Sequence, residues 1–465
     1  MLFSSITFLY YFLPCVLILY FAVPRKAKNL VLLLASLLFY AWGEPKYVIL
    51  MAISIGVGYV SGLLIEKYRE RSLSRYIMII SVAVCLGFLG YFKYANFFAD
   101  NLNNIAGKNI LVLNIALPIG ISFYTFQIIS YIVDVYRGTK AQKNFISIAA
   151  YISMFPQLIA GPIVRYVDIE KQLKNRVHSF DNAAVGIKRF VLGLGKKILI
   201  ANVLGEFCDI FRGSSDKSIM FFWLYAIAYA LHVYFDFSGY SDMAIGLGKI
   251  LGFDFLENFN YPFISKSATE FWRRWHMSLG TWFRDYVYIP MGGNRTSKGR
   301  WFFNIFVVWM LTGFWHGAAW NFLAWGLLFG VVLIIEKMWL YEKLNRSHVL
   351  SRVYTVVILL ISFVIFGCTD MGEAFSYIGS MFGIGGYPLL STECFYYLRS
   401  YGVTLILAIV GATPVVKEVF RKINTTKKGK TVLAVAEPIA WMILLVVVTA
   451  YLVDGSFNPF LYFRF

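Results

Sequence analysis

Two histidines are the residues of this chain whose type and setting are suited to chemistry. His316 stands in the segment LTGFWHGAAWN at 311–321, inside an apolar region that extends from Trp301 to Ile335. An ionisable side chain at membrane depth is costly, so it indicates a functional site that faces a cavity or a partner. A neutral imidazole can act as a general base near neutral pH. The alternative is a buried histidine that only bonds a backbone carbonyl.

The second histidine, His276, lies forty residues earlier, in the longest polar-rich stretch of the chain, 254–300. Large apolar side chains recur in that stretch at helical spacing: Phe271, Trp272, Trp275, Leu279, Trp282 and Phe283. This spacing predicts an amphipathic helix on the cytoplasmic membrane surface, with its aromatic stripe at the lipid boundary. We interpret His276 as a candidate for catalysis or for contact with an acyl carrier. The alternative is a structural histidine.

Three arginines lie on the polar side of the same predicted helix: Arg273, Arg274 and Arg284. A guanidinium group suits a phosphate, so Arg273 and Arg274 are weak candidates for binding the phosphate of an acyl donor. Contact with water or with lipid phosphate is the favoured alternative. No other segment suggests a site for a cofactor.

A second polar cluster follows a predicted membrane span, at Asp236, Ser238, Tyr240, Ser241 and Asp242. These side chains suit either the inner mouth of a cavity or the cap of a short helix. We favour the structural role.

The remaining sequence contains few signals of other chemistry. The five cysteines form no CxxC pair and have no histidine at metal-ligand spacing, so no metal site is expected. GxSxG, HExxH, Walker and Rossmann patterns are also absent from the sequence. The sequence therefore does not support a function as a hydrolase, a zinc protease or a nucleotide-driven pump.

The composition indicates which class of protein contains these residues. The chain has 465 residues, of which 59% are hydrophobic and 15% are charged. Ordinary soluble domains are roughly 45–50% apolar and about 25% charged, so we expect an all-α polytopic membrane protein. The net charge of +18 is what basic cytoplasmic loops produce, and nucleic acid is not an expected partner.

Hydrophobic runs fill most of the chain and predict about 11–12 transmembrane helices. They cover 6–23, 30–42, 46–65, 76–92, 115–136, 185–204, 219–238, 301–316, 318–336, 353–369, 400–416 and 431–452. The run 146–164 contains two prolines, and the run 240–253 is short and bounded by glycines, so both are predicted to be re-entrant segments. We expect one membrane domain, 1–465, with both termini outside the cytoplasm and 254–300 on the cytoplasmic side.

The segments around both histidines resemble a known family. The matching stretches are FWRRWHMSLGTWFRDYVYIPMGGNR, LTGFWHGAAWNFLAWG, ALPIGISFYTFQIISYIVDVYRG, MFPQLIAGPIVRY and YFDFSGYSDMAIGLG. They are similar to the membrane-bound O-acyltransferase (MBOAT) family, in particular its bacterial alginate O-acetyltransferase subunit I branch, and the related D-alanylation enzyme. The resemblance implies a ring of tilted helices around a central tunnel. It also implies that His316 is the essential catalytic residue and His276 a second histidine of the site.

The resemblance further implies the partners of the reaction. Acetylating members are assigned acetyl-CoA, whereas the D-alanylation enzyme uses an acyl carrier protein, and both donors present a pantetheine thioester from the cytoplasm. No bound cofactor is implied. Members generally work with an extracytoplasmic acyltransferase, so we expect an SGNH-like partner that completes transfer to the polymer. The expected location is the bacterial cytoplasmic membrane, with the lipid bilayer as the remaining partner.

The carboxyl-terminal segment 457–465, FNPFLYFRF, is similar to the aromatic motif of the small peptide that accompanies the D-alanylation enzyme. In that peptide a tyrosine accepts the acyl group, which implies the same role for Tyr462. A phenol needs a base to attack a thioester, and the ester that forms stays reactive. The alternative is an aromatic tail that anchors at the lipid interface.

Taken together, these features predict a membrane O-acyltransferase that passes an acyl group, expected to be acetyl, across the membrane to a cell-envelope or exported polysaccharide. A polytopic transporter is the alternative from another class, because broken helices also line transporter sites. A membrane scaffold for an extracellular transferase is a third reading. Alginate, cellulose, peptidoglycan and teichoic acid all remain open as acceptors.

Overall fold

The computed structural model describes residues 1–107, 115–455 and 460, and within these residues every regular element is a helix. The all-α class predicted from the composition is therefore confirmed for the described part of the chain. Close contacts divide the chain into two compact units. Whether these units behave as the single predicted membrane domain stays a prediction.

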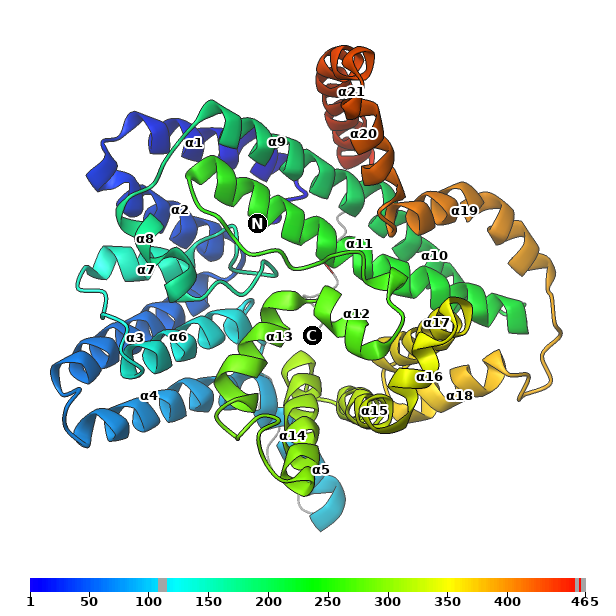
Figure 1. Cartoon of the computed structure of the whole chain (residues 1–465), viewed down its shortest axis with the longest axis horizontal. Coiled ribbons are helices and arrows are strands. Elements are labelled where there is room, and N and C mark those ends of the chain that lie inside the picture. The colour runs from blue at the N-terminus through cyan, green and yellow to red at the C-terminus, as the bar shows by residue number, and fades with distance from the viewer. Residues whose placement is uncertain (108–114, 456–459, 461–465) are drawn as a thin grey trace. The chain divides into compact units, whose positions relative to one another are not determined.

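Unit 1 consists of Met1–Phe190 and Ser241–Leu256. Its helices, in chain order, are α1 (Leu13–Ala22), α2 (Lys28–Gly43), α3 (Val48–Lys67), α4 (Leu73–Leu89), α5 (Ala95–Ala106), α6 (Ile121–Tyr136), α7 (Phe145–Ser153), α8 (Tyr166–Lys174) and the greater part of α9 (Phe180–Gly195). Helices α3, α4 and α6 pack on one another (Figure 1). Gly62 of α3 permits this approach, since a Cβ atom there would lie 2.5 Å from the hydroxyl of Tyr131 on α6.

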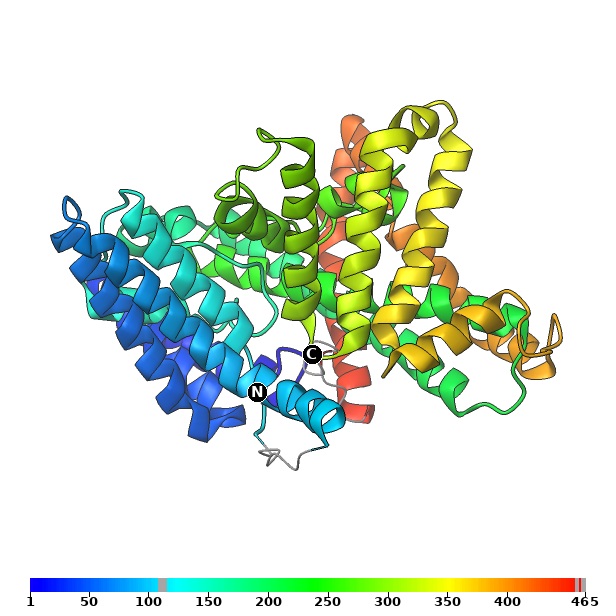
Figure 2. The same ribbon diagram turned by 90° about the horizontal axis from the view of Figure 1, so that it is seen from below.

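Unit 2 consists of Val191–Tyr240 and Glu257–Phe465. Its helices are α10 (Asn202–Gly213), most of α11 (Ile219–Leu251), α12 (Ala268–Arg274), α13 (Met277–Phe283), α14 (Lys298–His316), α15 (Trp320–Ile335), α16 (Tyr341–Asn345), α17 (His348–Gly367), α18 (Met371–Met381), α19 (Thr392–Gly411), α20 (Val415–Thr425) and α21 (Lys427–Asp454). Helix α15 contacts both α14 and α17, and the three run side by side in Figure 2. Buried aromatic and aliphatic side chains of α15 and α17 form a continuous core with those of α10, α11 and α12, and the half-buried Trp309 of α14 packs against it.

One predicted re-entrant segment is wrong. The run 240–253 does not turn back, because α11 continues unbroken from Ile219 to Leu251. The Asp236–Asp242 cluster therefore lies within a long helix and caps no helix end, contrary to the role we favoured. Glycine here serves packing: a Cβ atom at Gly239 would lie 2.8 Å from the carbonyl oxygen of Gly193 on α9.

The predicted break in the run 146–164 is confirmed. Helix α7 ends at Ser153, and no helix follows until α8 begins at Tyr166. Residues 154–164 are nevertheless buried. Non-helical backbone at such a place needs polar partners within the protein. Whether this segment re-enters the membrane stays a prediction.

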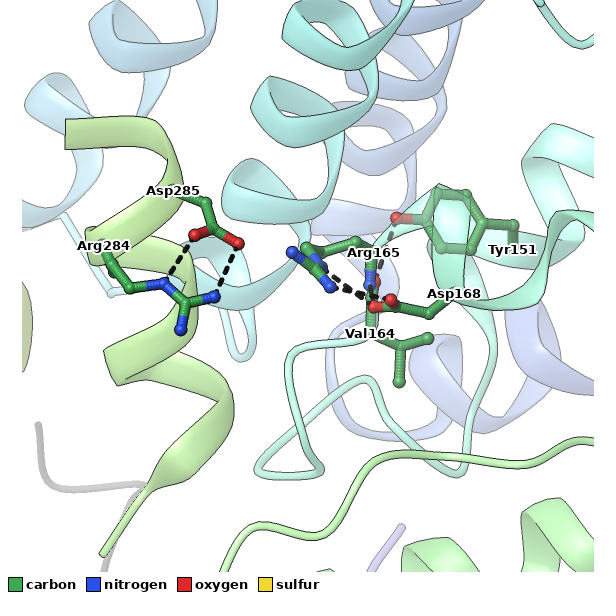
Figure 3. A network of polar contacts seen from close by, with 6 residues as sticks. All are labelled: Tyr151, Val164, Arg165, Asp168, Arg284 and Asp285. Carbon is green, nitrogen blue, oxygen red and sulfur yellow. Dashed lines mark hydrogen bonds and ion pairs between the residues drawn. The ribbon is translucent and has the colours of Figure 1, made fainter. Parts of the chain in front are cut away.

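Side chains supply some of these partners, as Figure 3 shows. The hydroxyl of Tyr151 donates to the carbonyl oxygen of Val164 at 3.0 Å. Asp168 accepts from both the backbone and the guanidinium group of Arg165 at 2.9–3.0 Å, which closes the first turn of α8. The figure also draws the separate Arg284–Asp285 ion pair of unit 2 (2.7 Å).

Seven helical stretches in the described residues are long and apolar enough to cross a membrane. They are Pro45–Lys67, Leu73–Ala106, Ile219–Leu251, Trp320–Leu344, His348–Gly367, Thr392–Gly411 and Lys427–Asp454, and the shorter apolar helix Thr7–Ala22 adds to them. Each overlaps a run predicted from hydropathy. Several other predicted runs coincide with helices below this length, so a total of about 11–12 crossings stays a prediction.

Candidate active site

Helices α14 and α15 form a hairpin that positions His316 at the last residue of α14. The backbones touch because both helices carry glycine at the crossing. A Cβ atom at Gly313 would lie 2.3 Å from the carbonyl oxygen of Phe322, and one at Gly326 would lie 2.4 Å from that of Trp309. Any larger residue would separate the helices and move the end of α14.

The imidazole of His316 is surrounded by aromatic rings. The side chain is 5% exposed, and the rings of Trp325 and Phe366 lie edge-on to it, with centroids at 5.2 and 5.3 Å. The His276 ring lies 6.4 Å away, centroid to centroid. The structure thus brings the two predicted histidines together, although forty residues separate them in sequence.

The segment that carries His276 differs from the predicted amphipathic helix. Helix α12 ends at Arg274 and α13 begins at Met277, and between them His276 takes a left-handed backbone conformation with φ of 45°. The prediction of one continuous surface helix is therefore wrong. Its apolar side chains are covered by protein: Phe271, Trp275, Leu279, Trp282 and Phe283 are buried and Trp272 is half-buried. Phe271, Trp272 and Trp275 belong to the core of unit 2.

Asn258 holds His276 in this conformation. Its side-chain oxygen accepts from the backbone N–H of Ser278 (3.3 Å), from the hydroxyl of Ser278 (2.9 Å) and from Nδ1 of His276 (3.2 Å). Because a backbone N–H can only donate, the atom that faces it is the oxygen, and Nδ1 of His276 must carry a proton. Nε2 of the neutral ring then carries the lone pair that can accept a hydrogen bond.

Burial also keeps His276 neutral. The residue is 1% exposed, and desolvation lowers the pKa of its imidazole to about 3. Sequence reasoning missed Asn258, because nothing distinguishes it from the other polar residues of the stretch 254–300.

A buried carboxylate fixes the start of α12. Glu336, fully buried at the end of α15, accepts from the backbone N–H groups of Ala268 (2.6 Å) and Thr269 (2.9 Å) and from the Thr269 hydroxyl (2.7 Å). A negative charge at a helix N-terminus stabilises the helix. Helix α12 is thereby tied to the hairpin that carries His316. Sequence reasoning missed this contact as well.

A small cavity opens beside His316, wholly within unit 2. Its lining is mostly aromatic and consists of Val233, Asp236, Phe237, Phe271, Trp272, Trp275, His316, Trp325, Phe329, Ser362, Phe363 and Phe366. The volume is about 20 Å³, whereas a water molecule needs roughly 10–15 Å³. The space therefore suits a group of very few atoms next to an imidazole.

An ion pair borders this cavity. Nζ of Lys197 lies 2.5 Å from Oδ1 of Asp236, and both side chains are almost fully buried. The same Nζ lies 4.6 Å above the ring of Phe460, which also packs edge-on against Tyr240 at 4.7 Å. Phe460 is 1% exposed. Lys197 falls inside the predicted span 185–204, so the rule that identified His316 also applied to it.

Three predicted site residues do not line the cavity of His316 or lie outside the described residues. Arg273 and Arg274 line a second, polar cavity of about 410 Å³ with Lys266, Ser267, Thr269, Glu270, Tyr341 and Leu344. Glu270 holds the Arg274 guanidinium at 2.9 Å. Tyr462 lies outside the described residues. In the described part of the chain no three histidine, cysteine or acidic side chains converge as metal ligands.

Comparison with known proteins gives these features a context. Residues 135–380 match the membrane-bound O-acyltransferase family. The chain is 39% identical to the probable alginate O-acetylase AlgI of Azotobacter vinelandii, over the full length of both proteins. It is 32% identical to the peptidoglycan O-acetyltransferase of Helicobacter pylori, covering 100% of this chain and 98% of that protein. It is also 32% identical to the teichoic acid D-alanyltransferase of Bacillus subtilis, over 54% of this chain and 67% of that protein.

The family match includes both histidines, the cavity and the Lys197–Asp236 pair. The resemblance noted in the sequence is thus confirmed over the whole chain, and the apolar helices agree with it. The chain belongs to the membrane-bound O-acyltransferase family and is a multi-pass membrane O-acyltransferase.

Proposed function

We propose that this enzyme moves an acetyl group from a cytoplasmic pantetheine thioester, through Tyr462, to a hydroxyl of a cell-envelope polysaccharide, with His316 as the general base. The observation that carries the proposal is the meeting of His316 and His276 at 6.4 Å beside a small aromatic cavity. Such a cavity excludes bulk water, which would otherwise hydrolyse the thioester.

The first transfer requires a base because a phenol is ordinarily protonated at neutral pH. His316 accepts the proton of the Tyr462 hydroxyl as its oxygen attacks the thioester carbonyl. The carbon–sulfur bond then breaks, and the departing thiolate takes the proton from the imidazolium. The products are an acyl-tyrosine ester and a free thiol, so the base is regenerated.

His276 has a different task in this scheme. Its Nδ1 proton is committed to Asn258, which leaves Nε2 as an acceptor of fixed direction. A neutral acceptor near His316 can orient a donor group of the substrate, such as a pantetheine amide. The left-handed backbone at His276 is consistent with such a role, since strained residues gather at functional sites.

The polar cavity beside α12 supports binding of the donor phosphates. Lys266, Arg273 and Arg274 border it, and Glu270 neutralises one of these three charges. Guanidinium groups bind phosphate in two-pronged geometry. We assign this cavity to the phosphate end of acetyl-CoA or of a carrier-protein thioester.

The buried position of Phe460 supports the proposal that Tyr462 accepts the acyl group. Phe460 packs on Lys197, whose partner Asp236 lines the cavity of His316. Two residues of chain extend at most roughly 7 Å, and the scheme requires the Tyr462 hydroxyl to reach the base within that length of Phe460.

The acceptor is proposed from the relatives, whose names include alginate, peptidoglycan and teichoic acid. We propose a polysaccharide of the bacterial envelope, reached with the help of an SGNH-like extracytoplasmic acyltransferase. This scheme locates the chain in the cytoplasmic membrane with both termini outside.

Mass spectrometry of the carboxyl-terminal peptide tests the proposal. The purified protein is incubated with isotope-labelled acetyl-CoA or acetyl-carrier protein, and the peptide that contains Tyr462 is sequenced. We expect one acetyl group on Tyr462 with one of these donors and none in Tyr462→Phe. The matched control is Tyr451→Phe, at an exposed tyrosine of α21, which should acetylate normally. Full polymer acetylation by Tyr462→Phe would remove the tyrosine step from the scheme.

A further inference from the structure

A second concentration of polar groups lies in unit 1, where α1 gives way to α2. We call it the cationic cluster and define it as Arg25, Lys28 and Arg176 with the rings of Tyr20 and Phe253. Nζ of Lys28 donates to the carbonyl oxygen of Tyr20 at 2.9 Å and lies 4.2 Å above the Tyr20 ring. The guanidinium carbon of Arg176 lies 5.7 Å from the same ring and 4.6 Å from that of Phe253.

The scaffold of this cluster is rigid. The Tyr20 hydroxyl donates to the carbonyl oxygen of Leu251 (2.7 Å) and therefore accepts from Nε2 of His178 (3.0 Å). Asn29 accepts from one arm of the Arg176 guanidinium, and the other arm, Nη1, is buried without a hydrogen-bond partner. The cations are thus held in place before any ligand arrives.

The positive charges of the cationic cluster have no acidic partner among residues 1–107, 115–455 and 460. In the part of the chain that the structure describes, neither Lys28 nor Arg176 forms an ion pair with aspartate or glutamate. Burial and the neighbouring positive charges of Arg176 and Arg25 lower the pKa of Lys28. Burying like charges together is unfavourable, and an anion would relieve that cost.

The surface beside the cluster is apolar. Ile18, Leu19 and Phe21 on α1 are 68%, 57% and 47% exposed. A small soluble anion would satisfy the cations and leave this face uncovered. An amphiphile satisfies both, with a phosphate at the cations and an acyl chain along α1.

We infer that the cationic cluster is a binding site for an anionic phospholipid, whose headgroup phosphate contacts Lys28, Arg25 and Arg176 while an acyl chain covers the exposed face of α1. The site is independent of the acyl transfer proposed above and uses none of its residues.

The test uses the full-length protein in vesicles of phosphatidylcholine, with or without phosphatidylglycerol. Thermal unfolding is followed by tryptophan fluorescence. We expect phosphatidylglycerol to raise the midpoint of the wild type by roughly 2–4 °C. Lys28→Met and Arg176→Met should each lose at least half of that rise, whereas Lys28→Arg should keep most of it.

Lys26→Met is the matched control, because it removes the same charge from an exposed neighbour in the same loop. It should keep the full rise. Inorganic phosphate added to the phosphatidylcholine vesicles separates the two sources of the anion, and we expect it to give no rise. The inference is overturned if Lys26→Met and Lys28→Met respond alike, if phosphate alone reproduces the effect, or if the wild type does not respond to phosphatidylglycerol.

Discussion

The cavity beside His316 and the cationic cluster of unit 1 both gather polar groups among aromatic rings, but in opposite electrostatic states. Next to the cavity, burial keeps the His276 ring neutral, and Lys197 pairs with Asp236. In the cluster, Lys28 and Arg176 lie over the same Tyr20 ring, and among the described residues neither pairs with a carboxylate. A neutral imidazole beside a paired charge can accept a hydrogen bond from a substrate, whereas a group of like charges suits the binding of an anion.

Aromatic rings take different orientations in the two regions. Trp325 and Phe366 meet the His316 imidazole at 82°, with ring edges and faces crossed. In the cluster, the Lys28 ammonium lies over the face of Tyr20. The face of an aromatic ring is negative and its edge positive, so faces stabilise cations and crossed contacts accommodate a neutral imidazole. Aromatic side chains therefore surround the polar groups in both regions, but in different orientations.

The largest effect that distinguishes the two regions is expected at His276, whose ring lies next to that of His316. His276→Ala should lower the turnover of acetyl thioester by about 10²–10⁴-fold, the range typical of a residue that takes part in proton transfer or its alignment. His348→Ala is the control, because His348 is exposed at the start of α17 and should leave turnover unchanged. Equal turnover in the two variants would deny His276 any part in the reaction.

Charge compensation at the cavity predicts a loss of stability. Lys197→Met removes the ammonium group that pairs with the buried Asp236 carboxylate, so the free energy of unfolding should fall by about 3–5 kcal/mol. Lys197→Met combined with Asp236→Asn should recover part of this loss. Lys28→Met in the cationic cluster removes one of several like charges, and its loss should be smaller. Denaturant unfolding in neutral detergent measures the free energy of unfolding of each variant. A larger loss of stability for Lys28→Met than for Lys197→Met would contradict the proposed difference between the two regions.

The size of the cavity predicts its acyl selectivity. Phe329 lines it and is 1% exposed, so Phe329→Leu should make room for a longer acyl chain. The ratio of kcat/KM for butyryl over acetyl thioester should rise roughly ten-fold, the discrimination that one or two methylene groups provide. Phe222→Leu, at a buried ring of the same core that does not line the cavity, should leave the ratio unchanged.

The smallest effect concerns pH. With a pKa lowered to about 3, His276 stays neutral from pH 5 to pH 9, so its titration cannot shape activity in that range. The acid side of the pH profile should therefore fall at the same pH in the wild type and in His276→Gln, although the variant is slower. A displaced acid side in the variant would show that His276 titrates near neutral pH.

Several parts of this site were predictable from sequence because their signal is local. An ionisable residue within an apolar run made His316 a candidate before the structure was known. Lys197 is also an ionisable residue within an apolar run, but it was not selected from the sequence. The family motifs supplied the pairing of His316 with His276, which spacing alone did not.

Other parts depend on tertiary contacts that no single segment reveals. The glycines near 240–253 suggested a broken helix, but α11 continues, and Gly239 and Gly246 serve close packing on α9. The aromatic spacing around His276 suggested one helix, whereas Asn258 stabilises a left-handed turn there. Glu336 caps α12 from a distant helix, so its role follows from the folded chain alone.

The most direct test of the account is the release of free thiol by His316→Ala in vesicles supplied with labelled acetyl thioester. We expect His316→Ala to release no thiol above the background of empty vesicles and to carry no label on Tyr462, while it folds and inserts as the wild type does. Continued thiol release with transfer of the label to Tyr462 or to polymer would contradict the assignment of His316 as the base.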